Sequence, residues 1–245
     1  MTNALRAYRL LLRWQYYRFR RELPIIVLIQ LALALGMIYG FTFLMPEIDR
    51  RSALYLATGA PTMTLLLLGL NVVPQEVSQG KLTGRFDYLR SLPIPRLAPM
   101  AADVSFWLIA ALPGTVLALL LGSLRFGFAL RVSWMIVPTV LLIAFSGSCV
   151  GYAMAMALRP QVANQISQFV AIGILLFSPL SFPAERLPEV LAKVHQVLPI
   201  QYMADLVRWS LTGTFADRPS LAFAVVGAWC AAGLAVSYRL ATRRR

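Results

Sequence analysis

The chain is poor in acidic residues, histidine and cysteine. Its 245 residues include ten Asp and Glu, one His and two Cys, and charged residues make up 13% of it, against about 25% in soluble domains. Since one histidine cannot form a zinc site alone, we expect no metal site at His195 or elsewhere. Cys149 and Cys230 both fall within apolar segments, so they imply no disulfide framework.

Six long segments contain no Asp, Glu, Lys or Arg at all. A helix that crosses the hydrocarbon layer needs about 20 mostly apolar residues, and a charge at its centre costs at least ~2.5 kcal/mol. We therefore predict an all-α membrane protein with six transmembrane helices. The six segments are residues 23–46, 52–75, 104–124, 132–158, 160–184 and 219–238.

These segments also lack the residues that catalysis or ion coupling would require. Coupling inside a membrane uses Asp, Glu, His or Lys within a span, and the nearest carboxylate, Asp103, directly precedes the third segment. We interpret Asp103 as a solvated residue at the start of a helix. The phosphate-binding pattern of Gly, four residues, Gly, Lys and Ser or Thr is absent, so this chain does not bind ATP by a P-loop. It is not predicted to be an enzyme, and energy for transport would have to come from a partner.

The net charge of +13 is distributed over the connecting segments. If the N-terminus is cytoplasmic, the inner segments hold fifteen of the 23 cations and the outer segments hold eight. Because positive residues favour the cytoplasmic side, this distribution predicts a multi-pass protein of the cell inner (plasma) membrane with both termini cytoplasmic. The charge is thus a topology signal, and no nucleic-acid partner is expected.

One membrane domain over residues 1–245 is predicted, because no interval between the apolar segments can hold a further domain. Outside the spans we expect an interfacial helix at residues 1–23, a cytosolic coupling loop at residues 76–100 and an outer amphipathic or re-entrant segment at residues 185–218. In that outer segment, apolar residues recur at helical spacing on both sides of Pro199, which predicts two short helices. Its polar residues, His195 among them, are expected on the opposite side.

Residues 4–21 form a predicted amphipathic helix. A basic face opposite an aromatic and aliphatic face is typical of a helix in the headgroup plane that is attracted to anionic membrane lipid. Two interpretations stay open: a topology anchor, or a helix that positions a partner protein. The basic face consists of Arg6, Arg9, Arg13 and Arg20, the apolar face consists of Leu5, Tyr8, Leu12, Tyr16 and Phe19, and Trp14 also belongs to the interfacial helix.

Residues 76–100 are the one inner loop long enough to form a compact structure. Phe86, Leu89 and Leu92 make an apolar stripe at three-residue spacing, and Pro93 ends the predicted helix. A short helix with such a stripe can insert into a groove of another protein, so we expect this loop to receive the energy from a partner.

The same loop resembles a known family. Residues 84–96 are similar to the pattern of Gly, acidic residue and Leu-Pro-Ile-Ser-Arg found in type-2 ABC transporter permeases (the ABC-2 type), most closely in the daunorubicin-resistance branch of drug exporters. A second series resembles the motifs that this family carries before its last span. This series is Phe182-Pro183, Leu187-Pro188, Leu198-Pro199, Tyr202 and Arg208.

The resemblance implies a dimer of permease subunits, expected to be a homodimer, carried by two copies of a separate ABC ATPase. That ATPase would bind ATP and Mg, so no cofactor is expected in this chain. The N-terminal helix and residues 76–92 would contact the ATPase. The coupling residues implied are Glu76, Gly84, Phe86, Asp87, Leu89, Arg90, Leu92 and Pro93.

The resemblance also implies a substrate path between the two permeases, lined by the first, second and fifth spans. Aromatic, Met and amide side chains in these spans suit a small hydrophobic or amphiphilic substrate, such as a drug, an antibiotic or a lipid-like molecule. Two alternatives are an exporter of polysaccharide or lipid-linked glycan and an ATP-independent membrane scaffold or enzyme. The candidate path residues are Phe41, Phe43, Met63, Asn71, Asn164, Gln168, Phe169 and Phe177.

Overall fold

The computed structural model describes residues 2–44, 50–95, 98–127, 133–180, 188–213 and 219–242. These residues form helices and no β-strand, which confirms the predicted all-α class. Six of the helical stretches are long and apolar enough to cross a membrane, as predicted. They are Leu23–Gly40, Ser52–Leu82, Ala98–Phe126, Ile136–Ala157, Pro160–Phe177 and Pro219–Leu240.

The first two spans are each interrupted by a π-helical turn. The first consists of α2 (Leu23–Leu35), η1 (Gly36–Gly40) and α3 (Phe41–Leu44), and the second of α4 (Arg50–Leu67), η2 (Leu68–Val72) and α5 (Val73–Leu82). The other spans are α7 (Ala98–Phe126), α8 (Ile136–Ala157), α9 (Pro160–Phe177) and α12 (Pro219–Thr242). Four further helices flank them: α1 (Thr2–Phe19), α6 (Arg85–Ser91), α10 (Glu189–Val197) and α11 (Pro199–Thr212).

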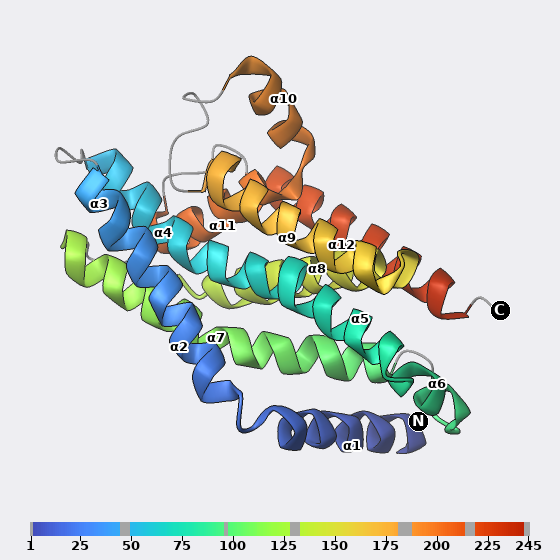
Figure 1. Ribbon diagram of the computed structural model, residues 1–245. Coiled ribbons are helices and arrows are strands. Elements are labelled where there is room, and N and C mark those ends of the chain that lie inside the picture. Colours follow the sequence, from blue (N-terminus) through green and yellow to red (C-terminus); the bar gives the residue numbers. More distant parts are fainter. Residues whose placement is uncertain are drawn as a thin grey trace.

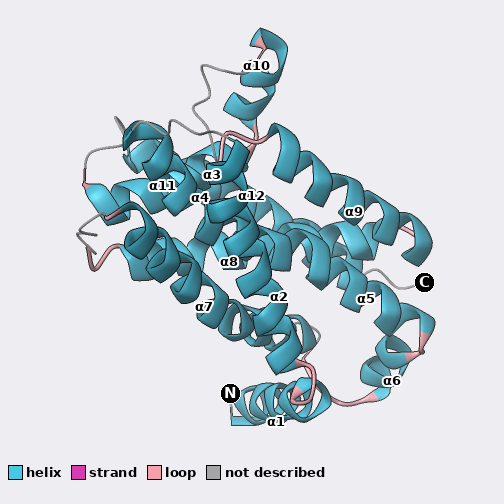
Figure 2. Ribbon diagram, turned by 60° about the vertical axis from the view of Figure 1, so that its left-hand side comes forward, coloured by secondary structure: helices cyan, strands magenta, loops and turns pink. Residues whose placement is uncertain are grey.

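The bundle has two distinct ends. Helices α1 and α6 lie at one end, and α3 and α10 lie at the other (Figures 1 and 2). Most residues of the second and fourth spans are buried (78% and 61%), whereas only 22% are buried in the first and fifth spans and 28% in the sixth. The first and fifth spans therefore offer the free faces on which lipid or another subunit can pack.

The second and fourth spans pack backbone against backbone through glycine. A Cβ atom added to Gly69 in η2 would lie 2.6 Å from the carbonyl carbon of Gly147 in α8, and one added to Gly151 would overlap the carbonyl oxygen of Gly69. Gly147, Gly151 and Ala155 recur every four residues and all lie on the buried face of α8. Small residues at this spacing are typical of close helix contacts inside membranes.

The outer segment forms the two predicted helices, α10 and α11, with Leu198 in extended conformation between them. The prediction for His195 is wrong, however. Its side chain is buried, and its Nε2 lies 3.0 Å from the carbonyl oxygen of Phe177 at the end of α9. Helix α10 folds over the end of α9, which turns His195 inward. Residues 185–187 and 214–218 of this segment lie outside the described residues.

Helix α11 packs inside the bundle against α4, α8 and α12, and it carries a buried cation, Arg208. The guanidinium of Arg208 donates to the carbonyl oxygens of Pro179 (3.1 Å) and Leu180 (2.6 Å), pairs with Asp205 at 2.8 Å and lies 4.0 Å from the Tyr55 ring centroid. Burial lowers the pKa of Arg208, and Asp205 opposes that shift. Because arginine ordinarily titrates above pH 12, the side chain stays charged and ties α9 to α11 and α4.

We expect Gly69→Ala to destabilise the protein by about 1–3 kcal/mol, because the added methyl group meets backbone atoms of α8 that cannot yield. The measurement is the thermal unfolding midpoint in detergent. Gly227→Ala in α12 is the matched control, since its Cβ meets no atom within 4 Å. Equal midpoints for the two variants would contradict the close packing of the second and fourth spans.

Candidate functional site

The predicted coupling loop is largely helical. Helix α5 continues the second span to Leu82, so Glu76 lies within the helix, and the turn begins only at Thr83. Gly84 follows with φ +71°, a left-handed conformation that disfavours any residue with a side chain. This turn reverses the chain and folds α6 back against α5.

The expected exposed stripe on α6 is not present. Leu89 is buried, and Phe86 packs on Tyr152 of α8 with 6.4 Å between ring centroids. The apolar side of α6 thus faces its own bundle. Asp87 and Tyr88 lie on the exposed side, with Tyr88 64% exposed.

Two of the remaining predicted coupling residues, Leu92 and Pro93, follow the end of α6. Leu92 is extended and half-buried, and Pro93 is exposed. The side chain of Arg90 lies outside the described residues, as does Arg96 of the family pattern. A partner protein can therefore reach Asp87, Tyr88 and Pro93 directly, whereas it would meet Leu89 only after α6 had moved.

A cluster of polar and charged side chains joins four helices at the α1–α6 end. Arg18 pairs with Glu76 at 3.0 Å, and Arg85 pairs with Asp103 at 3.8 Å. Gln15 donates a hydrogen bond to Asp103, and Arg85 donates to the carbonyl oxygen of Glu76 at 3.4 Å. We call these five residues the coupling cluster. It connects α1, α5, α6 and α7.

The coupling cluster corrects the interpretation of Asp103 as a solvated helix start. Asp103 is 8% exposed, because α1 covers the first turns of α7. Arg85 reaches it by lying across Gly80, where a Cβ atom would stand 2.7 Å from the Arg85 Nε. Since removing one member of a buried ion pair leaves an uncompensated charge, the pair holds α6 and α7 together.

Helix α1 packs along α7 through one face. Phe19 stacks on Phe106 at 5.4 Å between centroids, and Tyr8 donates to Ser105 at 2.9 Å. Leu5 and Tyr16, which were expected on the apolar face, are 55% and 53% exposed instead. The predicted basic residues Arg6, Arg9, Arg13 and Arg20 are exposed, and Trp14 is 41% exposed with the Arg85 guanidinium 5.9 Å from its ring.

Lys81 is a further connection at this end of the bundle. Its Nζ donates to the carbonyl oxygens of Ala155 (2.6 Å), Met156 (3.1 Å) and Leu158 (3.1 Å). A cation at a helix C-terminus satisfies carbonyl groups that have no partner within the helix and interacts favourably with the helix dipole. Lys81 thus attaches the second span to the end of the fourth.

The first, second and fifth spans enclose a small pocket. Its volume is about 240 Å³, and its lining includes Met37 of η1, Met63 of α4, Asn71 of η2 and Leu175 of α9. Two of the candidate path residues, Met63 and Asn71, therefore meet here. Both π-helical turns border the pocket, and such turns occur frequently at functional sites.

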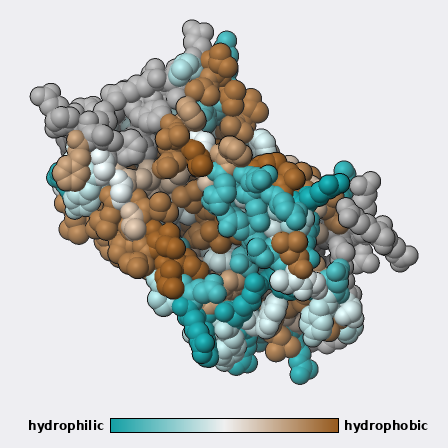
Figure 3. All heavy atoms as spheres, viewed as in Figure 1, coloured by the Kyte–Doolittle hydropathy of each residue, from teal (hydrophilic) through white to brown (hydrophobic). Residues whose placement is uncertain are grey.

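An amide-rich band extends from this pocket toward the α1–α6 end. Asn71 lies 3.5 Å from Gln168 of α9 and accepts a hydrogen bond from Gln75. Asn164 is half-buried on the same face of α9, and its Oδ1 makes no hydrogen bond among the described residues. Hydrophilic surface runs over α5 and α9 (Figure 3). Gln161 and Gln165 extend the amides of α9 and are exposed.

The aromatic candidate path residues do not line this pocket. Phe43 is 86% exposed on α3, while Phe169 and Phe177 are 75% and 52% exposed on α9. The side chain of Phe41 lies outside the described residues. Their free surfaces are available to lipid or a second subunit.

No group of His, Cys, Asp or Glu that could hold a metal ion occurs in the described ranges. The sequence analysis missed Gln15, Arg18 and Arg85 of the coupling cluster, because their partners lie far away in the chain. It also missed Gln75, Gln161 and Gln165, whose helical spacing to Asn71 and Gln168 was the available signal.

The family model of the ABC-2 type transporter matches residues 6–212. The chain therefore belongs to the ABC-2 type transporter family, whose members are multi-pass membrane proteins. No curated protein matches the sequence. Family membership makes the chain a permease component of an ABC exporter, and such permeases generally work with a partner ATP-binding subunit.

We expect Arg85→Gln to destabilise the protein by about 3 kcal/mol or more, because Asp103 would remain buried without a cation. The measurement is again the unfolding midpoint. In a double-mutant cycle, adding Asp103→Leu should recover part of the loss, since neither partner then carries a charge. Additive losses from the two substitutions would contradict a coupled pair.

Proposed function

We propose that the chain is the permease subunit of an ATP-driven exporter that moves a hydrophobic or amphiphilic molecule, such as a drug, an antibiotic or a lipid-like compound, out of the cell. The complex contains two permease chains, identical to each other, and two ATPase subunits that bind ATP and Mg. It lies in the inner (plasma) membrane with both permease termini cytoplasmic, and it is closest to the daunorubicin-resistance type. Family membership supports this proposal, as does the amide band that leads to an apolar pocket.

The amide band is the observation that carries the substrate path. Uncharged amides are costly in hydrocarbon unless they meet water or another polar group. Gln161, Gln165 and Gln168 are nevertheless exposed along a spanning helix. A water-accessible path beside α9 satisfies them, and the pocket at its end, with Met63 and Leu175, suits the apolar part of an amphiphile.

The coupling cluster provides the mechanical connection to the ATPase. A partner that contacts Asp87 and Tyr88 moves α6, and Arg85 transmits that movement to Asp103 in α7. Lys81 transmits it to the end of α8. ATP binding then favours one of two bundle states through its different contacts with each, which is what alternating access requires.

The other two hypotheses receive less support. The pocket lining is mostly apolar, which suits a drug-like molecule better than a polysaccharide or a glycan headgroup. An ATP-independent scaffold or enzyme does not agree with a family that generally works with an ATP-binding subunit.

We expect Tyr88→Ala to reduce the ATP-binding subunit that co-purifies in mild detergent by roughly fivefold or more, as loss of a central interface tyrosine does. Export should fall with it, while the unfolding midpoint stays unchanged, because Tyr88 is 64% exposed. Val190→Ala, 73% exposed on α10 at the opposite end, is the control. Unchanged retention in Tyr88→Ala would refute this docking face. Leu89 is unsuitable for the test, because substituting this buried residue would also disturb the packing of α6 on the bundle.

We expect Gln168→Cys to form a covalent dimer with a short thiol-reactive crosslinker in membranes, because the proposed path places α9 beside the second permease. Leu124→Cys, 80% exposed on α7, should remain monomeric. The native Cys149 and Cys230 are buried and do not interfere. The readout is the dimer fraction on a denaturing gel, and cross-linking of Leu124→Cys without Gln168→Cys would reject this arrangement.

A further inference from the structure

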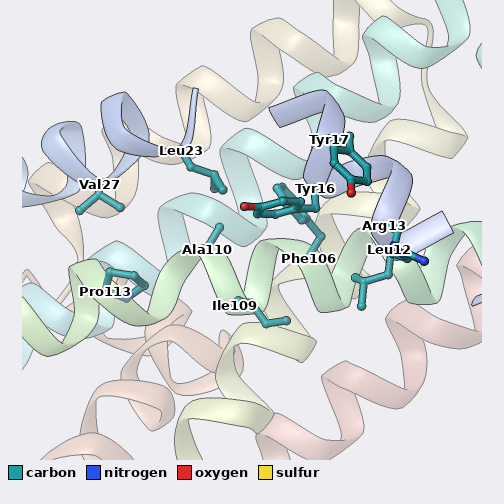
Figure 4. Close-up of a pocket in the computed structure, with 10 residues that line it drawn as sticks. All are labelled: Leu12, Arg13, Tyr16, Tyr17, Leu23, Val27, Phe106, Ile109, Ala110 and Pro113. Carbon is teal, nitrogen blue, oxygen red and sulfur yellow. The ribbon is translucent and has the colours of Figure 1, made fainter. Parts of the chain in front are cut away.

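A groove of about 540 Å³ lies between α1, α2 and α7, and it is separate from the proposed substrate path. Its walls are apolar and include Leu23 and Val27 of α2 and Ile109 and Pro113 of α7. Figure 4 shows Arg13 and Leu12 at one end of the lining and Pro113 and Val27 at the other. The groove is thus cationic at one end and apolar along the rest. No residue that lines it also lines the pocket beside α9.

The charged end of the groove has no acidic partner among the residues that the structure describes. Arg13 is exposed and pairs with no carboxylate in the parts of the chain that the structure describes. A second cation lies close by, since the Arg20 guanidinium is 5.7 Å from the ring of Tyr17, which lines the groove. The ring of Tyr17 is edge-on to that of Tyr16, which also lines it. Two positive charges along this wall of the groove favour an anion there.

The position of the groove indicates where its ligand comes from. Helices α2 and α7 are spans, and α1 lies across the α1–α6 end of the bundle (Figure 2). In the proposed orientation, the end of the groove at Arg13 therefore lies near the headgroup layer. The lining of Leu23, Val27, Ile109 and Pro113 continues along the spans away from Arg13. A ligand with an anionic head and an apolar tail fits this order, and the volume falls in the range of about 300–1,000 Å³ typical of ligand sites.

We propose that this groove binds one anionic phospholipid, with its phosphate on Arg13 and an acyl chain along Leu23, Val27 and Ile109. The assignment to the cytoplasmic leaflet rests on the proposed orientation of the chain. The bound lipid stabilises the packing of α1 on α7. Gln15 of the coupling cluster also belongs to α1 and binds Asp103 of α7, so lipid occupancy and the cluster depend on the same helix.

The test measures lipid retained by the purified complex of this chain with its co-purifying subunit. The complex is incubated in mixed micelles with equal amounts of palmitoyl-oleoyl phosphatidylglycerol and phosphatidylcholine. Unbound lipid is then removed, and the lipid that stays bound is identified by native mass spectrometry. We expect retained phosphatidylglycerol in preference to phosphatidylcholine. Arg13→Gln should reduce that preference about fivefold, the value of one cation near an anionic surface. Arg13→Lys should keep most of it.

Matched controls separate this site from general attraction to a basic helix. Arg9→Gln removes the same charge from α1 outside the groove and should leave retention unchanged. Ile109→Trp fills the groove and should reduce retention of both lipids, whereas Val116→Trp, on the exposed side of the same helix, should not. Each variant must keep the wild-type unfolding midpoint, and where Ile109→Trp does not, Ile109→Phe replaces it. Glycerol phosphate should not displace the bound phosphatidylglycerol, since it lacks an acyl chain.

Three results would overturn the proposal. Equal losses in Arg9→Gln and Arg13→Gln would mean that the helix attracts anionic lipid without a defined site. Equal retention of the two lipids by the wild-type protein would show that Arg13 does not select an anionic headgroup. Displacement of lipid by an exported drug would make the groove a substrate site. The lipid proposal is tested by bound lipid, whereas the proposed export function is tested by transport and ATPase retention. Failure of one proposal is therefore distinguishable from failure of the other.

Discussion

A cation taken out of water in a membrane protein must meet a carboxylate or carbonyl groups, and this requirement determines how the ends of the bundle are built. Arg85 meets Asp103, Lys81 meets the last carbonyl groups of α8, and Arg208 meets the carbonyl groups that follow α9. In each case the partner lies on a different span or at its end. The three cations therefore hold together a bundle whose spans lack charged pairs in their centres.

Between these ends, packing is uneven. The second and fourth spans meet through Gly69, Gly147 and Gly151, and their backbones are so close that a Cβ atom at Gly69 or Gly151 would clash. The first and fifth spans have far fewer buried residues, although Gln30 of the first span packs closely on Gly114 of α7, and both spans border the pocket. In the proposed transport cycle we therefore expect α2 and α9 to move more than the second and fourth spans, which would change the volume of the pocket that they border.

The sequence predicted features that depend on the local pattern. Charge-free segments identified the spans, Pro199 separated α10 from α11, and the small residues of α8 indicated its close contact. It did not predict which side of a helix another element covers. Asp103 has the spacing of a solvated helix start, but α1 covers it, and His195 has the spacing of a polar face, but α10 turns it inward.

The apolar side of α6 shows the same ambiguity at a candidate functional position. A three-residue spacing identifies an apolar face but not whether that face meets the same chain or a partner. In the structure Leu89 and Phe86 contact their own bundle. The exposed side of α6 carries Asp87 and Tyr88, which lie outside the apolar three-residue pattern. A contact made by a partner thus cannot be separated from an internal contact by periodicity alone.

The two ion pairs of the coupling cluster differ in strength, and the difference fixes where the α1–α6 end can open. Arg18 and Glu76 are 33% and 22% exposed, so their 3.0 Å pair resembles a surface salt bridge, worth about 0–1 kcal/mol. The side chains of Arg85 and Asp103 are only 9% and 11% exposed, and their pair is 3.8 Å long. The longer distance lowers the Coulomb attraction by about a fifth, but separating a buried pair leaves an uncompensated charge, which costs about 3–5 kcal/mol. A pull on α6 therefore carries α7 with it, and the contact between α1 and α5 separates first.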